Sequence, residues 1–436
     1  MRSSSRFLAA IAMTAIVVGA CSSSATPSPT TAPVTPAPTM APTMAPSTAP
    51  STAVTPAPSA AGLSVSSFDA SFSAMAQLTS ITSAGSGLVG VILPDVTTSA
   101  RYTSYDLPYL TQAFTAAGYT SSQFKIDNAS GTTTTEVAIA QADISAGAKV
   151  LLVDPLDGPT GLAIQSLAAA AGIPYISYDR ATFQGTTTYY VRFDNVQVGK
   201  LIGQGFMDCV TAWKVSSPQV FELDGGKDTD PNAISFAAGY NNVLWGTDLT
   251  NTKQIATGTT NSAGYKLVGD QIAPGWDNTK GQTVFQTAFT ANPKINATVE
   301  ANDGLANAAI TVLKGAGVKP NTIPTTGQDA TLQGMQNILQ GYQCGSVYKP
   351  IYLEAQAAVA LATYLRAGQT PPAALVNGTT TNPSTTGAAS EPAVLLTPYW
   401  VNATNMESTV IKDKFVSVTD LCNAVGAAVC TAAGIK

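Results

Sequence analysis

Histidine is absent from the 436 residues of this chain, and charged residues make up only 11% of it. Histidine is the commonest general base and metal ligand near neutral pH. Its absence excludes His-based metal sites and the Ser-His and Cys-His pairs of many hydrolases. Beyond the N-terminus the sequence also lacks an apolar run long enough to span a bilayer, which argues against an integral membrane protein.

Basic residues are few as well. The formal net charge is −5, and leaving out Arg2 and Arg6 of the N-terminal segment gives 19 basic against 26 acidic residues, a balance of −7. This balance argues against nucleic acid or an anionic membrane surface as a partner. No Cys-x-x-Cys occurs, so a zinc or redox role is not expected. The sequence therefore predicts neither a metal nor a cofactor.

The N-terminal residues indicate an exported protein. Arg2 and Arg6 precede an apolar stretch, Phe7 to Val18, which leads to the small residues of Val18-Gly19-Ala20-Cys21. This ending resembles the lipobox of bacterial lipoprotein signal peptides, in which the cysteine becomes the lipidated N-terminus. We expect residues 1–21 to be such a signal peptide and Cys21 to anchor the chain at the outer face of the cell membrane. The alternative is an ordinary signal peptide with an incidental cysteine.

Residues 22–61 consist almost entirely of Ser, Thr, Ala and Pro and carry no charge. Such a segment buries too little apolar surface to offset its ordering entropy, and its prolines keep it extended. We expect a disordered tether here. The roughly 370 residues that remain exceed one typical domain, so two lobes are expected.

Four cysteines remain once Cys21 is assigned to the lipid, and an even number in an exported protein indicates two disulfides. Cys422 and Cys430 lie close together in the sequence and form the simpler pair. Cys209 and Cys344 would then pair by elimination, although the sequence alone leaves this second pairing open.

Short apolar runs alternate with amphipathic helical windows from residue 88 onward. In the first half this alternation predicts strands at Leu88–Leu93, Phe124–Ile126, Val150–Val153, Pro174–Ser177 and Tyr189–Phe193. It predicts helices at Tyr105–Ala117, Thr134–Ala146, Gly161–Ala171 and Val196–Thr211. Alternation of this kind is typical of a parallel sheet with helices on both faces.

The pattern then starts again. The second half predicts strands at Val220–Leu223, Ala297–Glu300, Ile323–Thr325 and Val394–Leu396. Its predicted helices are Ala233–Leu244, Asn278–Ala291, Leu305–Gly315, Leu332–Leu339 and Leu353–Leu365. Two similar α/β lobes, each doubly wound and Rossmann-like, indicate a hinged molecule.

Polar side chains follow nearly every predicted strand, where ligands bind in doubly wound sheets. They include Pro94-Asp95, Arg101-Tyr102, Asp154-Pro155-Leu156-Asp157, Tyr178-Asp179-Arg180, Asp194-Asn195, Asp224 to Asn232, Gly275-Trp276, Asn302-Asp303-Gly304 and Gly327-Gln328-Asp329. Sugar hydroxyls both donate and accept hydrogen bonds, and sugar C–H faces pack on aromatic rings. This inventory therefore favours sugar recognition. Helix capping is the alternative, and for Asp303 or Asp194 it explains the residue equally well.

Several of these segments resemble the xylose-type sugar-binding proteins of ABC importers. The resemblance rests on Pro174-Tyr-Ile-Ser-Tyr-Asp-Arg180, Tyr189-Tyr-Val-Arg-Phe-Asp-Asn195, Val198-Gly199, Asn302-Asp-Gly304, Gly327-Gln-Asp-Ala330 and Val347-Tyr-Lys-Pro350, and it covers about residues 86–400. It implies a periplasmic-binding-protein fold of type I. The implied N-terminal lobe is residues 86–213 plus 349–392, and the C-terminal lobe is residues 214–348 plus 393–436.

The resemblance also implies a ligand-binding set between the two lobes. Its members are Arg101, Tyr102, Asp179, Arg180, Asn232, Trp276, Asn302, Asp329 and Lys349. Tyr102 stands where a Trp or Phe is more usual, and Asp230-Pro231 precedes Asn232 where the family commonly has Asp-Asn. Trp276 as a core residue and Lys349 as a hinge residue remain alternatives.

In this family three segments cross between the lobes, which here implies crossings near residues 212–218, 346–348 and 391–396. Cys209 and Cys344 would lie close to crossings, and a bridge between them would limit hinge opening.

The expected function is capture of a monosaccharide, a xylose-like pentose or a hexose, and its delivery to an ABC permease and its ATPase by a monomeric receptor. A sensor of the same fold, for a sugar or a signal molecule, is the alternative. A glycosidase with Asp179 and Asp329 as its pair is disfavoured, because Arg180 would keep Asp179 charged and unable to act as a general acid. The identity of the sugar stays open.

Overall fold

The computed structural model describes residues 63–96, 101–182, 188–227, 230–381 and 390–436. The predicted signal peptide, with Cys21, and the predicted tether at residues 22–61 lie outside these described residues. All described residues belong to one compact unit, Pro58–Lys436. Within the described ranges, no helix combines the length and the apolar character needed to cross a membrane.

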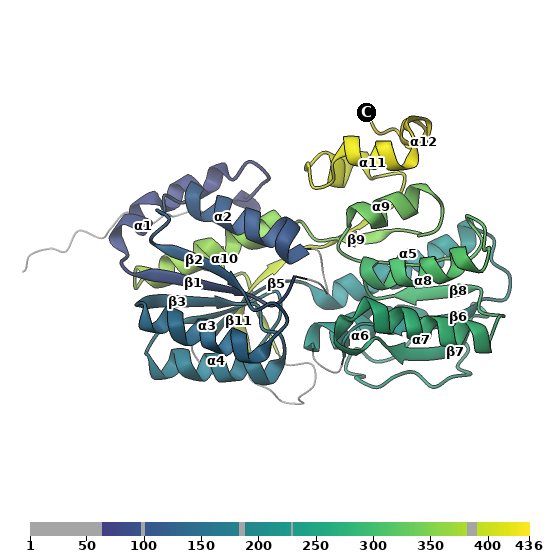
Figure 1. The fold of residues 1–436 in the computed structure, drawn as a ribbon, viewed down its shortest axis with the longest axis horizontal. Helices are drawn as coiled ribbons and strands as arrows, with labels where there is room; N and C mark the ends of the chain where they lie inside the picture. Colours follow the sequence, from purple (N-terminus) through teal and green to yellow (C-terminus); the bar gives the residue numbers. More distant parts are fainter. Residues whose placement is uncertain (1–62, 97–100, 183–187, 228–229, 382–389) are drawn as a thin grey trace, which may run out of the picture. The chain divides into compact units, whose positions relative to one another are not determined.

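The first lobe is built on a seven-stranded sheet with the order β10-β11-β5-β4-β3-β1-β2 (Figure 1). Its strands are β1 (Leu88–Leu93), β2 (Phe124–Asn128), β3 (Ala148–Val153), β4 (Tyr175–Tyr178), β5 (Thr188–Phe193), β10 (Gly378–Thr380) and β11 (Glu391–Leu396). Neighbouring strands are parallel, except that β10 pairs antiparallel with β11. The carboxyl ends of β1, β3, β4 and β5 therefore share one edge of the sheet.

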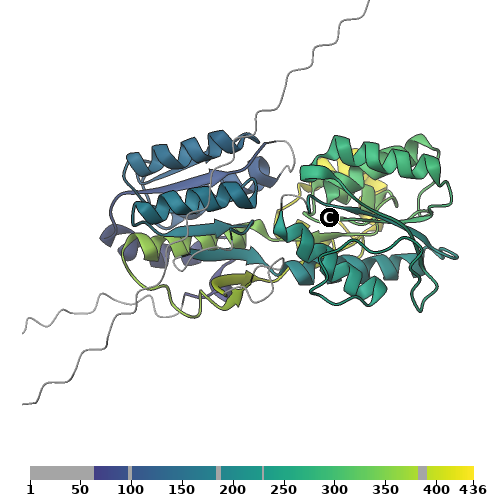
Figure 2. The ribbon, with the colours of Figure 1, turned by 90° about the horizontal axis from the view of Figure 1, so that it is seen from below.

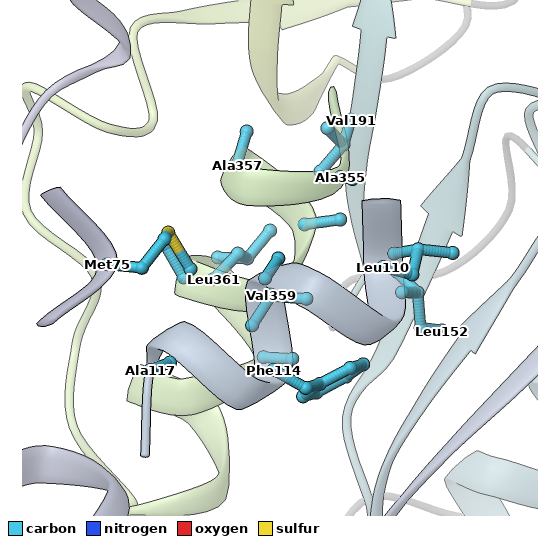
Figure 3. Close-up of a cluster of buried hydrophobic side chains, with 14 of the residues drawn as sticks. Met75, Leu110, Phe114, Ala117, Leu152, Val191, Ala355, Ala357, Val359 and Leu361 are labelled. Carbon is cyan, nitrogen blue, oxygen red and sulfur yellow. The ribbon is translucent and has the colours of Figure 1, made fainter. Parts of the chain in front are cut away.

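Helices cover both faces of this sheet (Figures 1 and 2). One face carries α1 (Thr79–Ala84), α2 (Leu107–Ala116) and α10 (Ile351–Arg366), and the other carries α3 (Thr133–Ser145) and α4 (Gly158–Ala170). The core on the first face brings together Phe114 of α2, Leu152 of β3 and Leu361 of α10 (Figure 3). Met75, from a helical turn at Ser73–Leu78, is fully buried in the same core. The first lobe thus begins before residue 86, where we expected it to start.

The second lobe is built on a three-stranded parallel sheet, β7-β6-β8, from β6 (Gln219–Asp224), β7 (Lys266–Ile272) and β8 (Ala297–Glu300). Beside it, β9 (Ser346–Tyr348) pairs antiparallel with β12 (Tyr399–Val401). Its helices are α5 (Asn195–Ala212), α6 (Pro231–Trp245), α7 (Asn278–Ala291), α8 (Asp303–Gly315) and α9 (Leu332–Leu339). Helix α5 packs on α6, and α7 packs on α8. The predicted two-lobed α/β architecture is confirmed.

The first crossing between the lobes lies earlier than we expected. Strand β5 ends at Phe193 in the first sheet, and α5 begins at Asn195. The apolar face of α5, which includes Ile202 and Phe206, is buried in the core of the second lobe. We expected this crossing near residues 212–218 and the lobe boundary at residue 213. Both positions are wrong by the length of α5. The helix was predicted correctly, but its sequence does not show which sheet its apolar face covers.

The other two crossings lie close to the expected positions. One connects β9 in the second lobe to α10 in the first, and the other connects β11 to β12. Because β11 pairs with β5 through Leu396, residues 393–396 belong to the first lobe and not, as expected, to the second.

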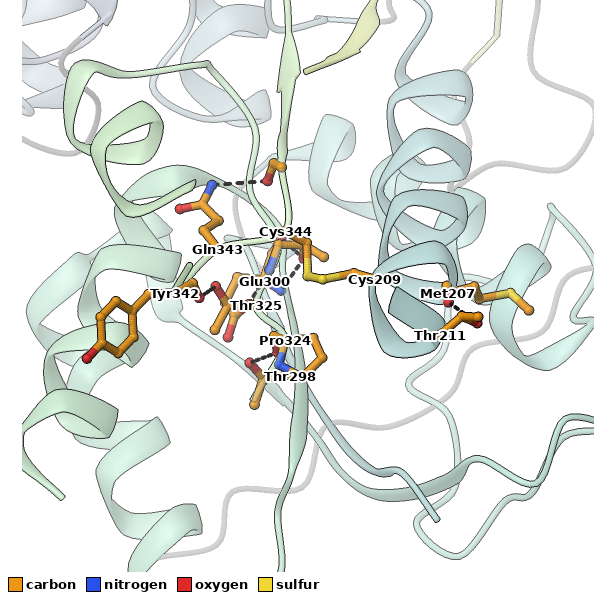
Figure 4. Close-up of a disulfide and its surroundings, with 12 residues drawn as sticks. Met207, Cys209, Thr211, Thr298, Glu300, Pro324, Thr325, Tyr342, Gln343 and Cys344 are labelled. Carbon is orange, nitrogen blue, oxygen red and sulfur yellow. Dashed lines mark hydrogen bonds between the residues drawn. A yellow bond between two sulfur atoms is a disulfide. The ribbon is translucent and has the colours of Figure 1, made fainter. Parts of the chain in front are cut away.

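Both predicted disulfides are present. Cys422–Cys430 joins α11 (Val418–Val425) to α12 (Ala427–Ala432) near the C-terminus. Cys209–Cys344 joins α5 to the segment that precedes β9 (Figure 4). Cys344 donates its backbone N–H to Thr325, next to β8, at 2.9 Å, so both cysteines lie in the second lobe. The bridge therefore lies within the second lobe and does not join the two lobes, and its effect on hinge opening stays a hypothesis.

Candidate ligand-binding site

A cavity lies at the carboxyl ends of strands from both lobes. All nine residues predicted from the sequence line it, together with three that were not in the predicted set. The predicted residues are Arg101, Tyr102, Asp179, Arg180, Asn232, Trp276, Asn302, Asp329 and Lys349, and the additional ones are Asp230, Phe236 and Gln328.

Each side chain reaches the cavity because it follows a strand or begins a helix. Arg101 and Tyr102 begin the π-helical turn Tyr102–Asp106 that follows β1, and Asp179 and Arg180 follow β4 directly. In the second lobe, Asn232 lies in the first turn of α6. The cavity thus occupies the position where doubly wound sheets bind ligands.

The Arg101 guanidinium is buried among carboxylates. It donates to both oxygens of Asp106 at 2.9 Å each, to Asp179 Oδ1 at 2.6 Å and to Glu354 Oε2 at 2.9 Å. Burial alone would lower the pKa of Arg101, but Asp106, Asp179 and Glu354 outweigh it and raise the pKa well above its usual value. Arg101 is therefore a fixed positive charge at the wall of the cavity.

Asp179 is held in its charged form. Burial works against its charge, but Arg101, Lys349 and Arg180 outweigh burial and lower its pKa. Its backbone adopts φ +53°, a left-handed conformation that is uncommon for a non-glycine residue. A carboxylate fixed in this way is an acceptor that is ready for a ligand hydroxyl.

Arg180 is the least engaged donor in the site. Its Nε lies 3.5 Å from Asp230 Oδ2 and 3.9 Å from Asp154 Oδ1, and within the described residues its guanidinium makes no hydrogen bond. Its Cζ lies 5.6 Å from the centre of the Tyr102 ring, which Arg101 approaches to 5.5 Å. Arg180 therefore keeps its donors available while Tyr102 holds the guanidinium in place.

Asp230 positions Trp276. Asp230 is the N-cap of α6, where its Oδ1 accepts the N–H of Asn232 at 2.8 Å. Its Oδ2 accepts the indole N–H of Trp276 at 3.1 Å. Trp276 also packs edge-to-face on Phe236 with the ring centres 6.2 Å apart, so it belongs to the lobe's core and lines the cavity at the same time.

Asn232 connects the two lobes. Its Nδ2 donates to the backbone oxygen of Asp179 at 2.7 Å. Its Oδ1 accepts from the Tyr190 hydroxyl at 2.8 Å and from Asn195 Nδ2 at 2.7 Å. Most of the hydrogen-bonding capacity of Asn232 is thus used between protein groups, and only one N–H of its amide remains for a ligand.

The remaining predicted residues complete the wall. Asn302 caps α8, its Oδ1 accepting from Leu305 N at 2.9 Å, so its side chain serves both the cap and the cavity. Lys349 lies at the second crossing, with its Nζ 3.1 Å from Asp329 Oδ1 and 3.9 Å from Asp179 Oδ1. Lys349 therefore combines the two roles that the sequence left open, a hinge position and a position at the cavity.

The residues outside the predicted set carried weak sequence signals. Phe236 follows Asn232 by one helical turn, a spacing that places both side chains on one face of α6. Gln328 lies inside the Gly327-Gln-Asp-Ala330 segment, and its buried Nε2 donates to Ala301 O at 3.2 Å. Among the described residues, no group of three or more His, Cys, Asp or Glu side chains is arranged to hold a metal ion.

Comparison with known proteins decides the family. A model of the periplasmic binding protein domain matches residues 89–370, well over half of the chain. The chain belongs to the periplasmic binding protein family. It is 34% identical over 297 residues to the D-xylose-binding periplasmic protein of Escherichia coli, covering 68% of this chain and 82% of that protein. It is 29% identical over 333 residues to a multiple sugar-binding periplasmic protein of Azospirillum brasilense, covering 74% and 88%.

Solved structures agree on the fold of this family member. A carbohydrate transporter solute-binding protein from Chloroflexus aurantiacus, in complex with D-glucose, matches with a TM-score of 0.64 and 24% identity over 77% of this chain and 98% of that chain. A solute-binding protein of an ABC transporter from Clostridium phytofermentans, with bound β-D-glucose, matches with a TM-score of 0.65 and 24% identity, covering 77% and 99%. The predicted type I periplasmic-binding-protein fold is confirmed.

Proposed function

We propose that this protein captures a monosaccharide in the cavity between its lobes and delivers it to an ABC importer. The cavity itself carries the argument, because it combines fixed charges of both signs with an indole and a phenol ring. Asp179 accepts from sugar hydroxyls, Arg180 donates to them, and Trp276 provides a flat apolar surface for the sugar C–H groups. The names of the relatives, which specify D-xylose or several sugars, support the same class of ligand.

The names of the relatives favour a single sugar ring, because they specify D-xylose or several sugars. The polar and aromatic lining of the cavity suits such a ring. We therefore propose a pentose or hexose ligand, with D-xylose as the first candidate. Binding to residues of both lobes would favour the closed arrangement, since a ligand shifts a conformational equilibrium by its differential affinity for the two states. The closed receptor would then dock on a permease.

We propose a binding role without catalysis. A glycosidase requires one carboxyl group that is protonated and able to act as an acid. Asp179 is held charged by its basic neighbours, and the Nζ of Lys349 contacts Asp329 at 3.1 Å. Asp179 is therefore suited to accept hydrogen bonds and not to donate a proton, while Asp329 is engaged by Lys349.

Membership of the family implies an extracytoplasmic location. We propose in addition that the lipid on Cys21 anchors the receptor and that residues 22–61 keep it near its importer. Mass spectrometry of the protein purified from membranes would test this anchor. A mature chain that begins at Cys21 and carries acyl groups supports it, whereas a chain that begins elsewhere contradicts it.

Thermal unfolding of residues 58–436 with a panel of sugars tests the main proposal. The panel contains D-xylose, D-glucose, D-galactose, L-arabinose and D-ribose. A ligand at a hundred times its Kd adds about 2.7 kcal/mol, so the unfolding midpoint rises by a few degrees. The Arg180→Ala variant serves as the control and should lose this shift. The absence of a shift with every sugar would contradict the proposal.

A further inference from the structure

A second pocket lies on the surface of the second lobe, beside the Cys209–Cys344 disulfide. This open pocket shares no lining residue with the cavity described above. Two of the four tryptophans of the chain, Trp213 and Trp400, line it. Trp400 packs against the core of the second lobe, and both indoles remain partly exposed at the pocket.

Trp400 is wedged at the pocket by two glycines. The plane of its indole lies against Gly205 of α5 and Gly345 before β9, and a Cβ atom at either glycine would overlap the ring. The side chain is nevertheless only partly buried, and its ring N–H has no hydrogen-bond acceptor within the described ranges. The fold therefore fixes the indole firmly while it leaves the polar edge unused.

Trp213 is placed differently. It is the C-cap residue of α5, it is half-buried, and its indole N–H likewise finds no acceptor in the described part of the chain. Five residues earlier, Asp208 is exposed and uses Oδ1 to accept from Gln204 Nε2 at 2.9 Å, which leaves Oδ2 available. The C-terminal part of α5 thus contributes an indole and a carboxylate to the lining of the pocket.

Carboxamides complete the lining. Asn402 uses Oδ1 to accept from Thr404 N at 2.9 Å and from Thr404 Oγ1 at 2.7 Å, so its Nδ2 retains both protons. Gln343, only 1% exposed, donates to Asp303 Oδ1 at 2.8 Å and Gly345 O at 3.1 Å. Its Oε1 is a buried acceptor without a partner among the described residues. The wall of the pocket therefore offers hydrogen-bond donors and acceptors together with the Trp213 indole and the polar edge of the Trp400 indole.

We propose that this pocket binds a saccharide longer than a monosaccharide. Indole faces pack against sugar C–H groups, while carboxylate and carboxamide groups exchange hydrogen bonds with hydroxyls. Its position on an open surface admits a chain of several rings, which the smaller cavity between the lobes does not. The disulfide forms part of the wall and holds the end of α5 against the segment before β9, so the spacing of the two indoles is fixed. The proposal is independent of the function assigned to the first cavity.

Calorimetric titration with two neutral trisaccharides, xylotriose and cellotriose, tests this proposal. The background is Arg180→Ala, so that heat from the first cavity does not contribute. At about 10 mM sugar, even a Kd of 1 mM gives near-complete binding. We expect binding of at least one trisaccharide, and we expect Trp213→Ala or Asp208→Asn to weaken it about tenfold, since one such contact is worth about 1.4 kcal/mol.

Trp245→Phe is the matched control. Trp245 lies on α6, outside both pockets, and its Nε1 donates to Glu222 Oε1 at 2.6 Å, so its replacement should leave trisaccharide binding unchanged. If Trp213→Ala fails to fold, the exposed Asp208→Asn variant decides the question. The proposal is overturned if neither trisaccharide binds, or if binding survives both pocket variants at full strength. In the first case the partly exposed indoles would fit a docking surface for a protein.

Discussion

Trp276 owes its position to two small features of neighbouring residues. Gly225, just after β6, lies against the indole, and a Cβ there would overlap the ring. Asp230 Oδ2 accepts the indole N–H at 3.1 Å. Trp276 itself has φ +60°, a conformation that costs energy for a bulky residue and persists only where its surroundings enforce it. The orientation of this ring is therefore specified by several contacts at once.

We predict that Gly225→Ala displaces Trp276 and weakens sugar binding about tenfold or more, because the indole would no longer face the cavity. The overlap should also cost about 1–3 kcal/mol of unfolding free energy. Calorimetric titration with the preferred sugar measures the first effect. Gly158→Ala is the control, because no atom lies within 4 Å of a Cβ at that position. Unchanged sugar affinity in Gly225→Ala would show that Trp276 acts only in the core.

Glu300, at the end of β8, is a buried carboxyl group that has no ion-pair partner among the described residues. Its Oε2 accepts from Thr326 N at 2.9 Å, while Oε1 has no hydrogen-bond partner in the described part of the chain. Burial raises the pKa of Glu300 to about 8, with hydrogen bonds only partly opposing the shift. At neutral pH the folded chain therefore holds a proton that the unfolded chain releases.

The sign of the pH effect follows from this difference. The pKa of Glu300 is about 8 in the folded chain and 4.5 for a glutamate in the unfolded chain. The stability that the protonated Glu300 contributes is therefore complete below about pH 4.5 and is lost as the pH rises to 8. We predict that Glu300→Gln, which mimics the protonated form, is about neutral at pH 5 and stabilises by roughly 1–4 kcal/mol at pH 8. Chemical denaturation of both proteins at the two pH values measures this. An equal effect of the substitution at both pH values would contradict it.

At the scale of helices and strands, the sequence predicted the positions of the elements far better than which elements pack against one another. Helix α5 was predicted almost to the residue and assigned to the wrong lobe, because amphipathicity does not identify the partner sheet. Strand β7 was missed because Gly269 and Asp270 interrupt its apolar pattern. Gly269 is required there because a Cβ would meet the ring of Phe221 at 2.7 Å. Such a close approach is a tertiary requirement that local propensity cannot show.

The stretch Ile323–Thr325 shows the opposite error. It was predicted as a strand, and the structure assigns none there, although Pro324 O accepts from Thr298 N at 2.9 Å beside β8. Pro324 has no N–H to donate, so the ladder cannot continue regularly. The site itself was predicted better than these elements, because its residues follow strands whose carboxyl ends meet in space.

The two disulfides close loops of very different length. Cys209–Cys344 spans 135 residues, and Cys422–Cys430 spans 8. The chain-entropy model assigns them about 5 and about 2.5 kcal/mol respectively. We therefore predict that Cys209→Ala with Cys344→Ala lowers the free energy of unfolding more than Cys422→Ala with Cys430→Ala does. Denaturant titration of the two double variants measures this. A larger loss from the C-terminal pair would show that enthalpic effects outweigh chain entropy here.

At the scale of the whole compact unit, the C-terminal segment contacts both lobes. Phe415 stacks on Tyr105 of the first lobe, with ring centres 4.0 Å apart and planes at 9°. Asp413 accepts from the hydroxyls of Tyr348 at 3.1 Å and Tyr352 at 2.9 Å, on either side of the second crossing. The same core includes residues of α9 in the second lobe. Tyr105 lies in the turn that also carries Tyr102, so this segment connects to the cavity.

We predict that Phe415→Ala weakens sugar binding roughly threefold to tenfold, equivalent to about 0.5–1.5 kcal/mol, through loss of the stack that holds the turn Tyr102–Asp106. It should also cost about 3–5 kcal/mol of stability. Leu421→Ala is the control, because Leu421 is fully buried in the same segment but has no aromatic ring that could stack on Tyr105. Calorimetric titration of both variants separates the effects. Equal weakening of sugar binding in Phe415→Ala and Leu421→Ala would show that the effect comes from general destabilisation and not from loss of the stack.

The position of the Cys209–Cys344 bridge has a mechanical consequence. A chain that is pulled from its two ends transmits force along its covalent path, and an intact bridge removes the enclosed residues from that path. The bridge encloses 135 residues, and a stretched chain gains about 3.3–3.6 Å per residue, so the oxidised protein would lengthen by about 450–490 Å less than the reduced one. More than a quarter of the chain, including β6, β7 and β8, would thus carry no pulling force while the bridge is intact.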